Sequence, residues 1–321
     1  MKRVGASLLL LILLTASLLF LPPDSLNPSR STQAASTIFS VQTGNWSNPS
    51  IWNLGRTPQT GDDVIISPWT TITYDVASDQ VLGQVIVDGT LTFSRAVDTR
   101  MKVADHIVVG FHAPDALVSL DGGFLDLGTP ADPIPAGVDA EIIFVLPQGY
   151  VFSGGPTPQA PDVGLWAAGG RWEVHGAPLT RTWSKLADDA LASTDPATVV
   201  VENNVIDWPI GGEVVVTQTS NPYRPDTNCN LDDACSYHWE NEVRAITTLS
   251  SLPGGRTLVT LDQPLEFDHQ GTGQTRGEVG LLSRNVLIRT EITGVADATL
   301  DQQTSERRFA HTMLMGGTQG S

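Results

Sequence analysis

The sequence predicts an all-β chain wound as a parallel, β-helix-like solenoid, and residues 61–93 carry the prediction. This stretch holds short runs of β-branched and apolar residues separated by Gly, Pro, Asp and Ser clusters, which is the pattern of strands and turns. It has no sustained i, i+3, i+4, i+7 apolar period of the kind that indicates a helix. The runs follow so closely that the chain turns a corner every few residues. A β-sandwich of short hairpins is the alternative.

Asp-Gly corners followed by short strands recur along the chain. Asp88-Gly89 precedes residues 90–93, and Asp121-Gly122-Gly123 precedes residues 124–127. Because an Asp-Gly pair is equally a hairpin turn, this echo fits both folds. Further strands are predicted within residues 171–176, 207–216, 244–247, 257–261 and 285–289.

A short helical turn is predicted at only one place, residues 183–192. Near it, residues 211–216 read GGEVVV and restate the GDDVII of residues 61–66. The restated pattern indicates another strand of the same kind.

Composition divides the chain into three predicted parts. Residues 1–35 combine a basic start, an apolar run at residues 8–21 and small residues at a cleavage position, which predicts a signal peptide. An uncleaved membrane anchor is the alternative, although the run is short for a full span. Residues 36–176 are predicted to form one β domain. Residues 177–321 are expected to continue as a β-rich region that leads into a β-helix and is cut short before its end.

The charge balance limits the partners. Acidic residues number 35 against 18 basic, and the formal net charge is −17. Nucleic acid is not expected as a partner, because phosphate backbones are bound through clustered Lys and Arg. The export signal predicts a secreted, extracellular or periplasmic protein. In such an oxidising compartment Cys229 and Cys235 are expected to form a disulfide.

The polar loop around these cysteines offers a partial calcium signal. Oxygen ligands alternate along it as in a calcium-binding loop, at Asp226, Asn228, Asn230 and Asp232. Leu231 stands where such a loop needs Gly, and Tyr237 stands where it needs Glu. A disulfide-fastened acidic surface loop without Ca²⁺ is the alternative.

An imidazole, an aromatic ring and two carboxylates follow this loop within five residues, at His238, Trp239, Glu240 and Glu242. A ring beside carboxylates suits a sugar, whose C–H face stacks on the ring while the acids accept its hydroxyl protons. The start of a strand with alternate residues facing outward would give the same pattern.

The chain resembles the G8-domain family of extracellular proteins over about residues 45–312. The matching elements include Trp52, residues 61–66, residues 89–93, His175-Gly176, Asp207-Trp208, Gly212-Glu213, His269 and residues 282–286. Gly212 departs from the Asp that the family usually carries. The resemblance implies a β-rich extracellular module attached to a right-handed parallel β-helix, with a role in binding or degrading polysaccharide. Some members of the family act on hyaluronan.

Two function classes therefore stand side by side. One is a hydrolase or lyase acting on an acidic polysaccharide such as hyaluronan, and the other is a non-catalytic carbohydrate-binding or adhesion module. The sequence has no GxSxG, HExxH, P-loop or CxxC motif, so any chemistry must come from dispersed residues. The candidate catalytic residues are His175, His238, Glu240, His269 and Arg284. The candidate substrate-binding residues are Trp239, Glu242 and His311.

Structural roles are the alternative for these side chains, such as a corner hydrogen bond for a histidine or a carboxylate partner for Arg284. The expected partner is a polysaccharide or glycoconjugate. A downstream β-helix is a further expected partner if the chain is a fragment. Contact with a membrane is expected only if the segment of residues 1–35 stays uncleaved.

Overall fold

The computed structural model describes residues 36–110, 122–147, 163–220, 240–292 and the backbone of 311–315. Within these ranges the chain is all β, with one short 3-10 turn at Pro49–Ile51 and no α-helix. No helix there is long and apolar enough to cross a membrane.

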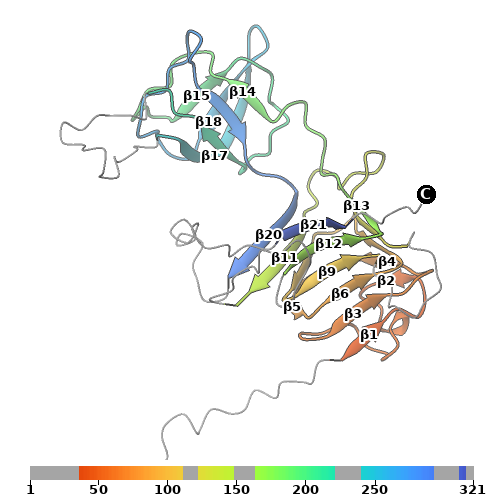
Figure 1. Cartoon of the computed structure of the whole chain (residues 1–321). Coiled ribbons are helices and arrows are strands. Elements are labelled where there is room, and N and C mark those ends of the chain that lie inside the picture. The colour runs from red at the N-terminus through yellow and green to blue at the C-terminus, as the bar shows by residue number, and fades with distance from the viewer. Residues whose placement is uncertain (1–35, 111–121, 148–162, 221–239, 293–310, 316–321) are drawn as a thin grey trace, which may run out of the picture.

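Three parallel sheets form a solenoid, and from β3 to β13 every third strand belongs to the same sheet (Figure 1). The first sheet runs in the order β1 (Thr37–Phe39), β3 (Asp63–Ile66), β6 (Val85–Val87), β9 (His106–Val109), β12 (Gly164–Ala168) and β21 (His311–Met315). The second runs β2 (Gly44–Asn45), β4 (Thr71–Tyr74), β7 (Thr90–Phe93), β10 (Phe124–Leu127) and β13 (Arg171–Val174). The third runs β5 (Ala77–Leu82), β8 (Thr99–Val103), β11 (Ala140–Leu146) and β20 (Val286–Ile292). The predicted parallel, β-helix-like solenoid is confirmed.

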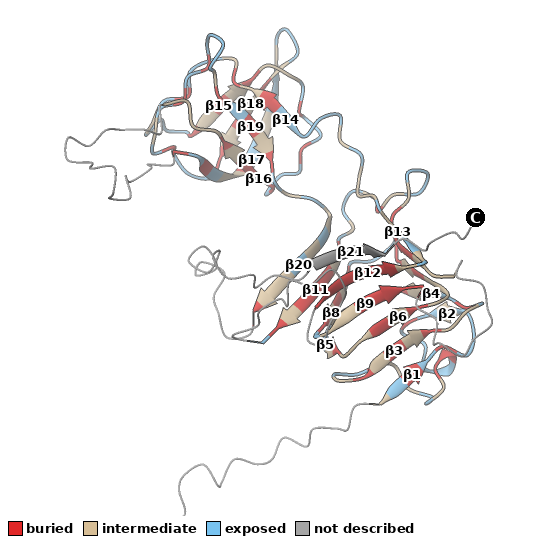
Figure 2. Cartoon of the chain, viewed as in Figure 1, coloured by how far each residue is buried: buried red, intermediate tan, exposed pale blue. Residues whose placement is uncertain are grey.

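The solenoid core consists of columns of side chains that repeat from coil to coil. Ile72, Leu91 and Leu125 occupy the same register position in β4, β7 and β10, and all three are 0% exposed. Figure 2 shows buried residues, in red, along the solenoid strands. Alternation of buried and exposed residues puts one face of each strand inside, and burial of each such aliphatic side chain contributes about 1.5–3 kcal/mol.

Two tryptophans and a tyrosine close the N-terminal end of this core. Trp46 makes edge contacts with Trp52 and Tyr74 at ring-centroid distances of 4.8 and 4.9 Å. The Trp52 indole N–H donates to the Trp46 carbonyl at 3.0 Å, so the buried ring keeps a hydrogen-bond partner.

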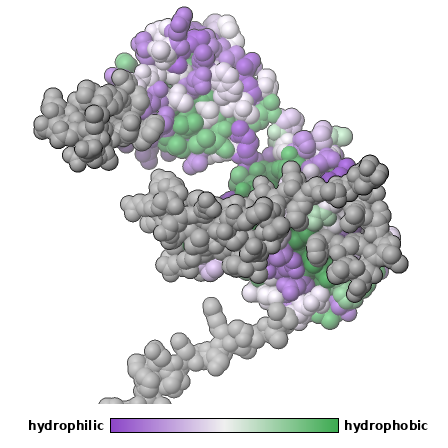
Figure 3. All heavy atoms as spheres, viewed as in Figure 1, coloured by the Kyte–Doolittle hydropathy of each residue, from purple (hydrophilic) through white to green (hydrophobic). Residues whose placement is uncertain are grey.

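Between β13 and β20 the chain leaves the solenoid and forms a six-stranded antiparallel sheet. Its order is β14 (Trp183–Lys185), β19 (Glu278–Leu281), β16 (Glu213–Val216), β17 (Glu242–Leu252), β18 (Arg256–Leu261) and β15 (Thr198–Val201). This antiparallel unit has its own apolar core. In Figure 3 polar residues cover much of its upper surface and apolar residues gather on its lower side.

Two local predictions for this region need correction. The expected helical turn at residues 183–192 is wrong, because Trp183–Lys185 pairs with β19 as a strand; so short a helix is marginal on its own, and strand pairing prevails. The GGEVVV segment is a strand as predicted, yet β16 lies in an antiparallel sheet while β3 lies in a parallel one. The local pattern specifies a strand with one buried face. It does not specify whether the neighbouring strand runs parallel or antiparallel.

A single asparagine joins the exit from the solenoid to the return. The Asn285 side-chain amide donates to the carbonyls of Ile134, Pro135 and Val138 at 3.2, 3.1 and 2.9 Å. Its carbonyl oxygen accepts from the Ala177 N–H at 2.9 Å. The segments that leave and re-enter the solenoid are therefore held at one point.

Candidate functional site

Glycine repeats at the corner where the chain passes from the first sheet to the second. Gly89, Gly123 and Gly170 precede β7, β10 and β13. A Cβ atom at Gly123 would lie 2.3 Å from the Val87 carbonyl oxygen, and one at Gly89 would lie 2.3 Å from the Ser67 carbonyl oxygen. Successive coils thus contact each other backbone to backbone, and only glycine fits. Residues 88–93 and 122–127 form the same solenoid corner in successive coils, with Gly169-Gly170 as a third instance.

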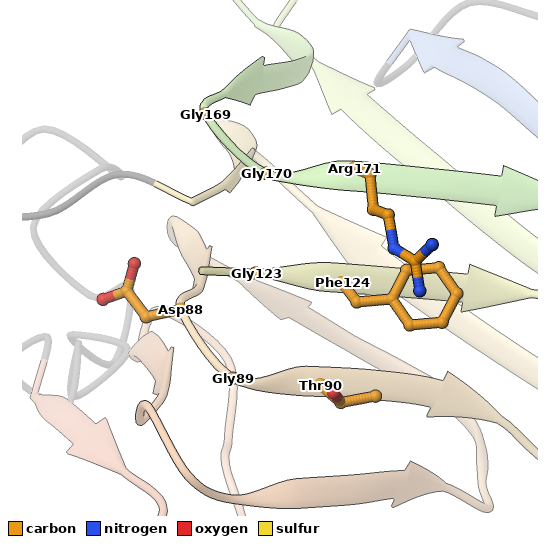
Figure 4. A pocket seen from close by; sticks show the side chains of 8 residues that line it. All are labelled: Asp88, Gly89, Thr90, Gly123, Phe124, Gly169, Gly170 and Arg171. Atoms are coloured by element: carbon orange, nitrogen blue, oxygen red, sulfur yellow. The ribbon is translucent and has the colours of Figure 1, made fainter. Parts of the chain in front are cut away.

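The absence of side chains at this corner leaves a groove of about 490 Å³ on the surface. It is lined by Asp88, Gly89, Thr90, Gly123, Phe124, Gly169, Gly170 and Arg171 (Figure 4). We call this the corner groove. Its floor is glycine backbone, and its side chains are a carboxylate, a hydroxyl, an aromatic ring and a guanidinium.

The strand register aligns three of these side chains across the outer face of the second sheet. Thr90 is the partner of Phe124, and Phe124 is the partner of Arg171. Neighbouring strands lie about 4.8 Å apart, so the row offers one contact point per coil. An extended ligand that crosses the strands would meet these residues in succession.

Arg171 and Phe124 form a stacked pair at one end of the corner groove. The guanidinium carbon lies 4.1 Å from the ring centroid, and Figure 4 shows the guanidinium over the ring. The side chain is 68% exposed and is 3.5 Å from the Glu173 carboxylate. The ring supports the guanidinium from one side, and an exposed guanidinium has donors that can form paired hydrogen bonds to a carboxylate.

A buried carboxylate lies beside this row, two residues farther along β10 on the same face of the sheet. Asp126 accepts from Arg95 at 2.7 and 2.9 Å, from the Thr92 hydroxyl at 2.7 Å and from the Gly128 N–H at 2.8 Å. These four hydrogen bonds occupy both carboxylate oxygens and join β7 to β10. The strands on which Thr90 and Phe124 stand are therefore firmly connected.

Two of the sequence-predicted residues, Glu242 and His269, meet in the core of the antiparallel unit. The His269 ring is 0% exposed, and its Nε2 lies 2.9 Å from Glu242 Oε1 while its Nδ1 lies 2.9 Å from the Thr217 carbonyl oxygen. Both ring nitrogens face acceptors, a carboxylate oxygen and a backbone carbonyl oxygen. Through these contacts His269 connects the start of β17, at Glu242, with the residue that follows β16, Thr217.

Glu242 is held as a carboxylate by several donors. Burial alone would raise its pKa, but the N–H groups of Glu266 and Phe267, the His269 ring and the charge of Arg244 outweigh burial and hold the pKa below its ordinary value. Arg244 donates to Oε2 at 2.5 Å. A carboxylate so fully occupied and only 4% exposed is placed to stabilise the fold.

The other described candidates make different contacts. Glu240 is buried and accepts from the Ser220 hydroxyl. His175 follows β13, where its N–H donates to the Leu127 carbonyl at 3.1 Å. Arg284 donates to the backbone carbonyls of Leu281 and Ser283 at 2.8 and 2.7 Å.

Several predicted positions lie outside the described residues. These are the signal peptide at 1–35 and the residues Cys229, Cys235, Asp226, Asn228, Asn230, Asp232, His238 and Trp239. His311 begins β21, of which the backbone alone is described. In the ranges that the structure covers, no group of three or more His, Cys, Asp or Glu side chains could hold a metal ion.

A second, smaller pocket of about 260 Å³ lies beside the third sheet. Its lining includes Asp98, Asp139, Glu141 and Arg284. Burial, followed by the charges of Asp98 and Glu141, raises the pKa of Asp139. Hydrogen bonds from Arg100 and Arg289 at 2.8 and 2.6 Å outweigh burial and lower the pKa of Glu141. We call this the acidic pocket.

The parallel coils and the glycine corners define an all-β solenoid protein. Residues 51–187 match the model described as the G8 domain, a span that includes the whole corner groove. This part of the chain is similar to a G8 domain.

The similar proteins are much longer than this chain. Fibrocystin-L of Homo sapiens is 26% identical over 256 residues, which cover 76% of this chain and 5% of the relative. Fibrocystin of Canis lupus familiaris is 23% identical over 275 residues, which cover 82% of this chain and 6% of the relative. A G8 domain-containing protein of Dictyostelium discoideum is 28% identical over 132 residues, or 41% of this chain and 10% of the relative.

The side chains of the corner groove were not among the residues predicted from sequence. The signal that could have found them is the Asp-Gly echo itself, because a corner repeated in successive coils brings the following residues side by side. Arg171 follows the third corner, where the pair is Gly169-Gly170 and carries no Asp.

Proposed function

We propose that this chain is an extracellular polysaccharide-binding module that holds an acidic saccharide in the corner groove. The observation that carries the proposal is the stacked Arg171–Phe124 pair at the edge of a groove floored by glycine backbone. The export signal at residues 1–35 supports the extracellular setting.

Each side chain of the groove has a counterpart in an acidic sugar chain. The Arg171 guanidinium pairs with a uronate carboxylate through two parallel hydrogen bonds. Asp88 and Thr90 exchange hydrogen bonds with hydroxyl groups. The glycine floor lets a sugar ring approach the backbone closely.

The overall charge limits how strong this binding is. A chain with a net charge of −17 repels a polyanion at long range, so attraction comes from the local cation and weakens as salt screens it. We therefore expect site-dependent, salt-sensitive binding.

At the corner groove, binding without turnover is better supported than hydrolysis. Glycosidases use two carboxyl groups that flank the bond to be cleaved. Within the described lining, Asp88 is the one carboxyl side chain. This difference favours a binding module over a hydrolase at the corner groove.

The acidic pocket gives the enzyme alternative one specific observation. There burial and the neighbouring acids raise the pKa of Asp139, while hydrogen bonds from two arginines lower that of Glu141. Two carboxyl groups whose pKa values are pushed apart are typical of a general acid and its partner. A hydrolase acting here would release oligosaccharides, and D139N would abolish the release.

The test is a panel of immobilised acidic and neutral polysaccharides, with the exported chain assayed for both retention and product release. We expect retention on an acidic polysaccharide, lost in R171A and kept in R256A. Arg256 is a matched control, because it is an exposed arginine of the antiparallel unit, 40% exposed, with a 3.4 Å ion pair to Asp188. Equal retention of R171A and wild type would overturn the proposed site.

A further inference from the structure

One exposed tryptophan has a backbone conformation that favours glycine. Trp69 is 88% exposed and has a φ of 70°. It lies in a turn closed by a 3.1 Å hydrogen bond from the Thr70 N–H to the Ser67 carbonyl. Pro68 and then a residue with positive φ are the central positions of a type II turn, whose second central position normally carries Gly or Asn.

Neither packing nor backbone preference accounts for this tryptophan. Bulky residues with positive φ are rare and strained. A side chain that is 88% exposed gains little from apolar burial. The backbone conformation of Trp69 is thus unfavourable for folding, and the burial of its side chain contributes little.

The turn that carries Trp69 directly adjoins the corner groove. A Cβ atom at Gly89 would lie 2.3 Å from the Ser67 carbonyl oxygen and 2.4 Å from that of Thr70. The Thr90 N–H donates to the Thr70 carbonyl at 2.9 Å. Residues 67–70 are therefore the same corner in the preceding coil, and the turn that carries Trp69 packs against Gly89 at the end of the groove.

We propose that Trp69 is a sugar-stacking residue that extends the corner groove by one coil. From the coil of Trp69 to that of Arg171 there are three strand spacings, or about 14 Å. Between them lie Asp88, Thr90 and the glycine corners, which suit a chain rich in hydroxyl groups. The ligand is an oligosaccharide of several rings, with an apolar ring face on Trp69 and a carboxylate at Arg171.

This inference rests on the proposed function and makes a separate claim about ligand length. A short acidic oligosaccharide reaches Arg171 alone, whereas a longer one also reaches Trp69. Affinity should therefore rise with length in the wild type, and the increase should depend on the indole ring.

The test measures affinity for acidic oligosaccharides of increasing length by calorimetry, with melting temperature measured in parallel. We expect W69G to leave the melting temperature unchanged or raise it, because glycine adopts positive φ without strain. We expect the same variant to bind the long oligosaccharide about tenfold more weakly, which corresponds to the upper range for an aromatic contact, and to bind the short one like wild type. W69N, whose side chain also tolerates this backbone, should behave alike.

Controls separate this inference from the proposed function. W183A removes another exposed tryptophan, 49% exposed and in the antiparallel unit, and should leave affinity unchanged. If W69G and W69N bind long oligosaccharides as tightly as wild type while R171A binds weakly, the role of Trp69 is wrong and the proposed function stands. If wild type binds no oligosaccharide of any length, both are overturned.

Discussion

The Arg171 guanidinium is held 4.1 Å above the centre of the Phe124 ring, across the β10–β13 pair. A cation over an aromatic face is attracted by the ring quadrupole, by about 0.5–1 kcal/mol at an exposed site. The ring therefore restricts a long side chain that would otherwise move freely in solvent. The stack turns an ordinary surface arginine into a preoriented anion-binding group.

Replacing Phe124 by Leu should weaken ligand binding without removing the charge. F124L keeps apolar bulk beneath Arg171 but removes the π face, so the guanidinium loses its fixed plane. We expect a threefold to tenfold loss of affinity for an acidic oligosaccharide, measured by calorimetry. F39L is the matched control, because Phe39 is a 41% exposed phenylalanine of the first sheet; an equal loss in F39L would contradict the role of the stack.

The glycine corner should tolerate no side chain. G123A introduces a Cβ atom 2.3 Å from the Val87 carbonyl oxygen at a φ of 124°, so the coils must separate. We expect a loss of more than about 3 kcal/mol in the free energy of unfolding by urea denaturation. Gly137 also has a positive φ, 82°, but nothing lies within 4 Å of its Cβ position, so G137A should lose only about 1 kcal/mol. Similar losses in the two variants would contradict the close-contact argument.

The Glu242–His269 pair should make the free energy of unfolding depend on pH. The pKa of Glu242 is lowered from its ordinary value of 4.5 by folding, so the carboxylate stabilises the native state at pH values above 4.5. This contribution is lost as the pH falls through the lower, folded-state pKa.

E242Q tests this directly. Removing one partner of a buried pair destabilises by roughly 3–5 kcal/mol, so we expect that loss at neutral pH and a smaller difference from wild type in acid. E266Q is the control, because Glu266 is 77% exposed. A pH dependence of unfolding identical in E242Q and wild type would show that Glu242 does not titrate with folding.

Asp139 should have the opposite effect on stability. Burial and neighbouring acids raise its pKa above the ordinary 3.8, so its charged form is disfavoured in the folded chain. The penalty appears as the pH rises above 3.8 and is complete above the folded-state pKa. D139N should therefore be more stable than wild type at neutral pH and equal to it below pH 3.8, as measured by thermal unfolding at several pH values. A D139N variant less stable than wild type at neutral pH would contradict the raised pKa.

The solenoid could be predicted from sequence because its signals are local. Short strands with one buried face and Asp-Gly corners can be recognised within a few residues, and the match of Thr90 with Phe124 in neighbouring coils follows from aligning two such corners. The third corner, Gly169-Gly170, lacks the Asp and follows residues 148–162, so its alignment with the others is not visible in the sequence.

The antiparallel unit and the candidate site depend on longer-range relations. The GGEVVV and GDDVII segments have the same pattern, and only distant partners decide that β16 is antiparallel and β3 parallel. Likewise, Trp69 stands beside an ordinary proline turn in the sequence. Its positive φ and its place against Gly89 are consequences of the coil that follows.

The most direct test of the central claim is calorimetric titration of an acidic polysaccharide and of its carboxyl-reduced form into wild type and R171A. The account predicts that wild type binds the acidic form and that this binding weakens with added salt, because Arg171 pairs with a carboxylate. It predicts that reducing the carboxyl groups of the polysaccharide removes most of the affinity, and that the R171A substitution does the same. Titrating the reduced polysaccharide into R171A should then show little further loss. Independent, additive losses, or tight binding of the reduced polysaccharide by wild type, would contradict it.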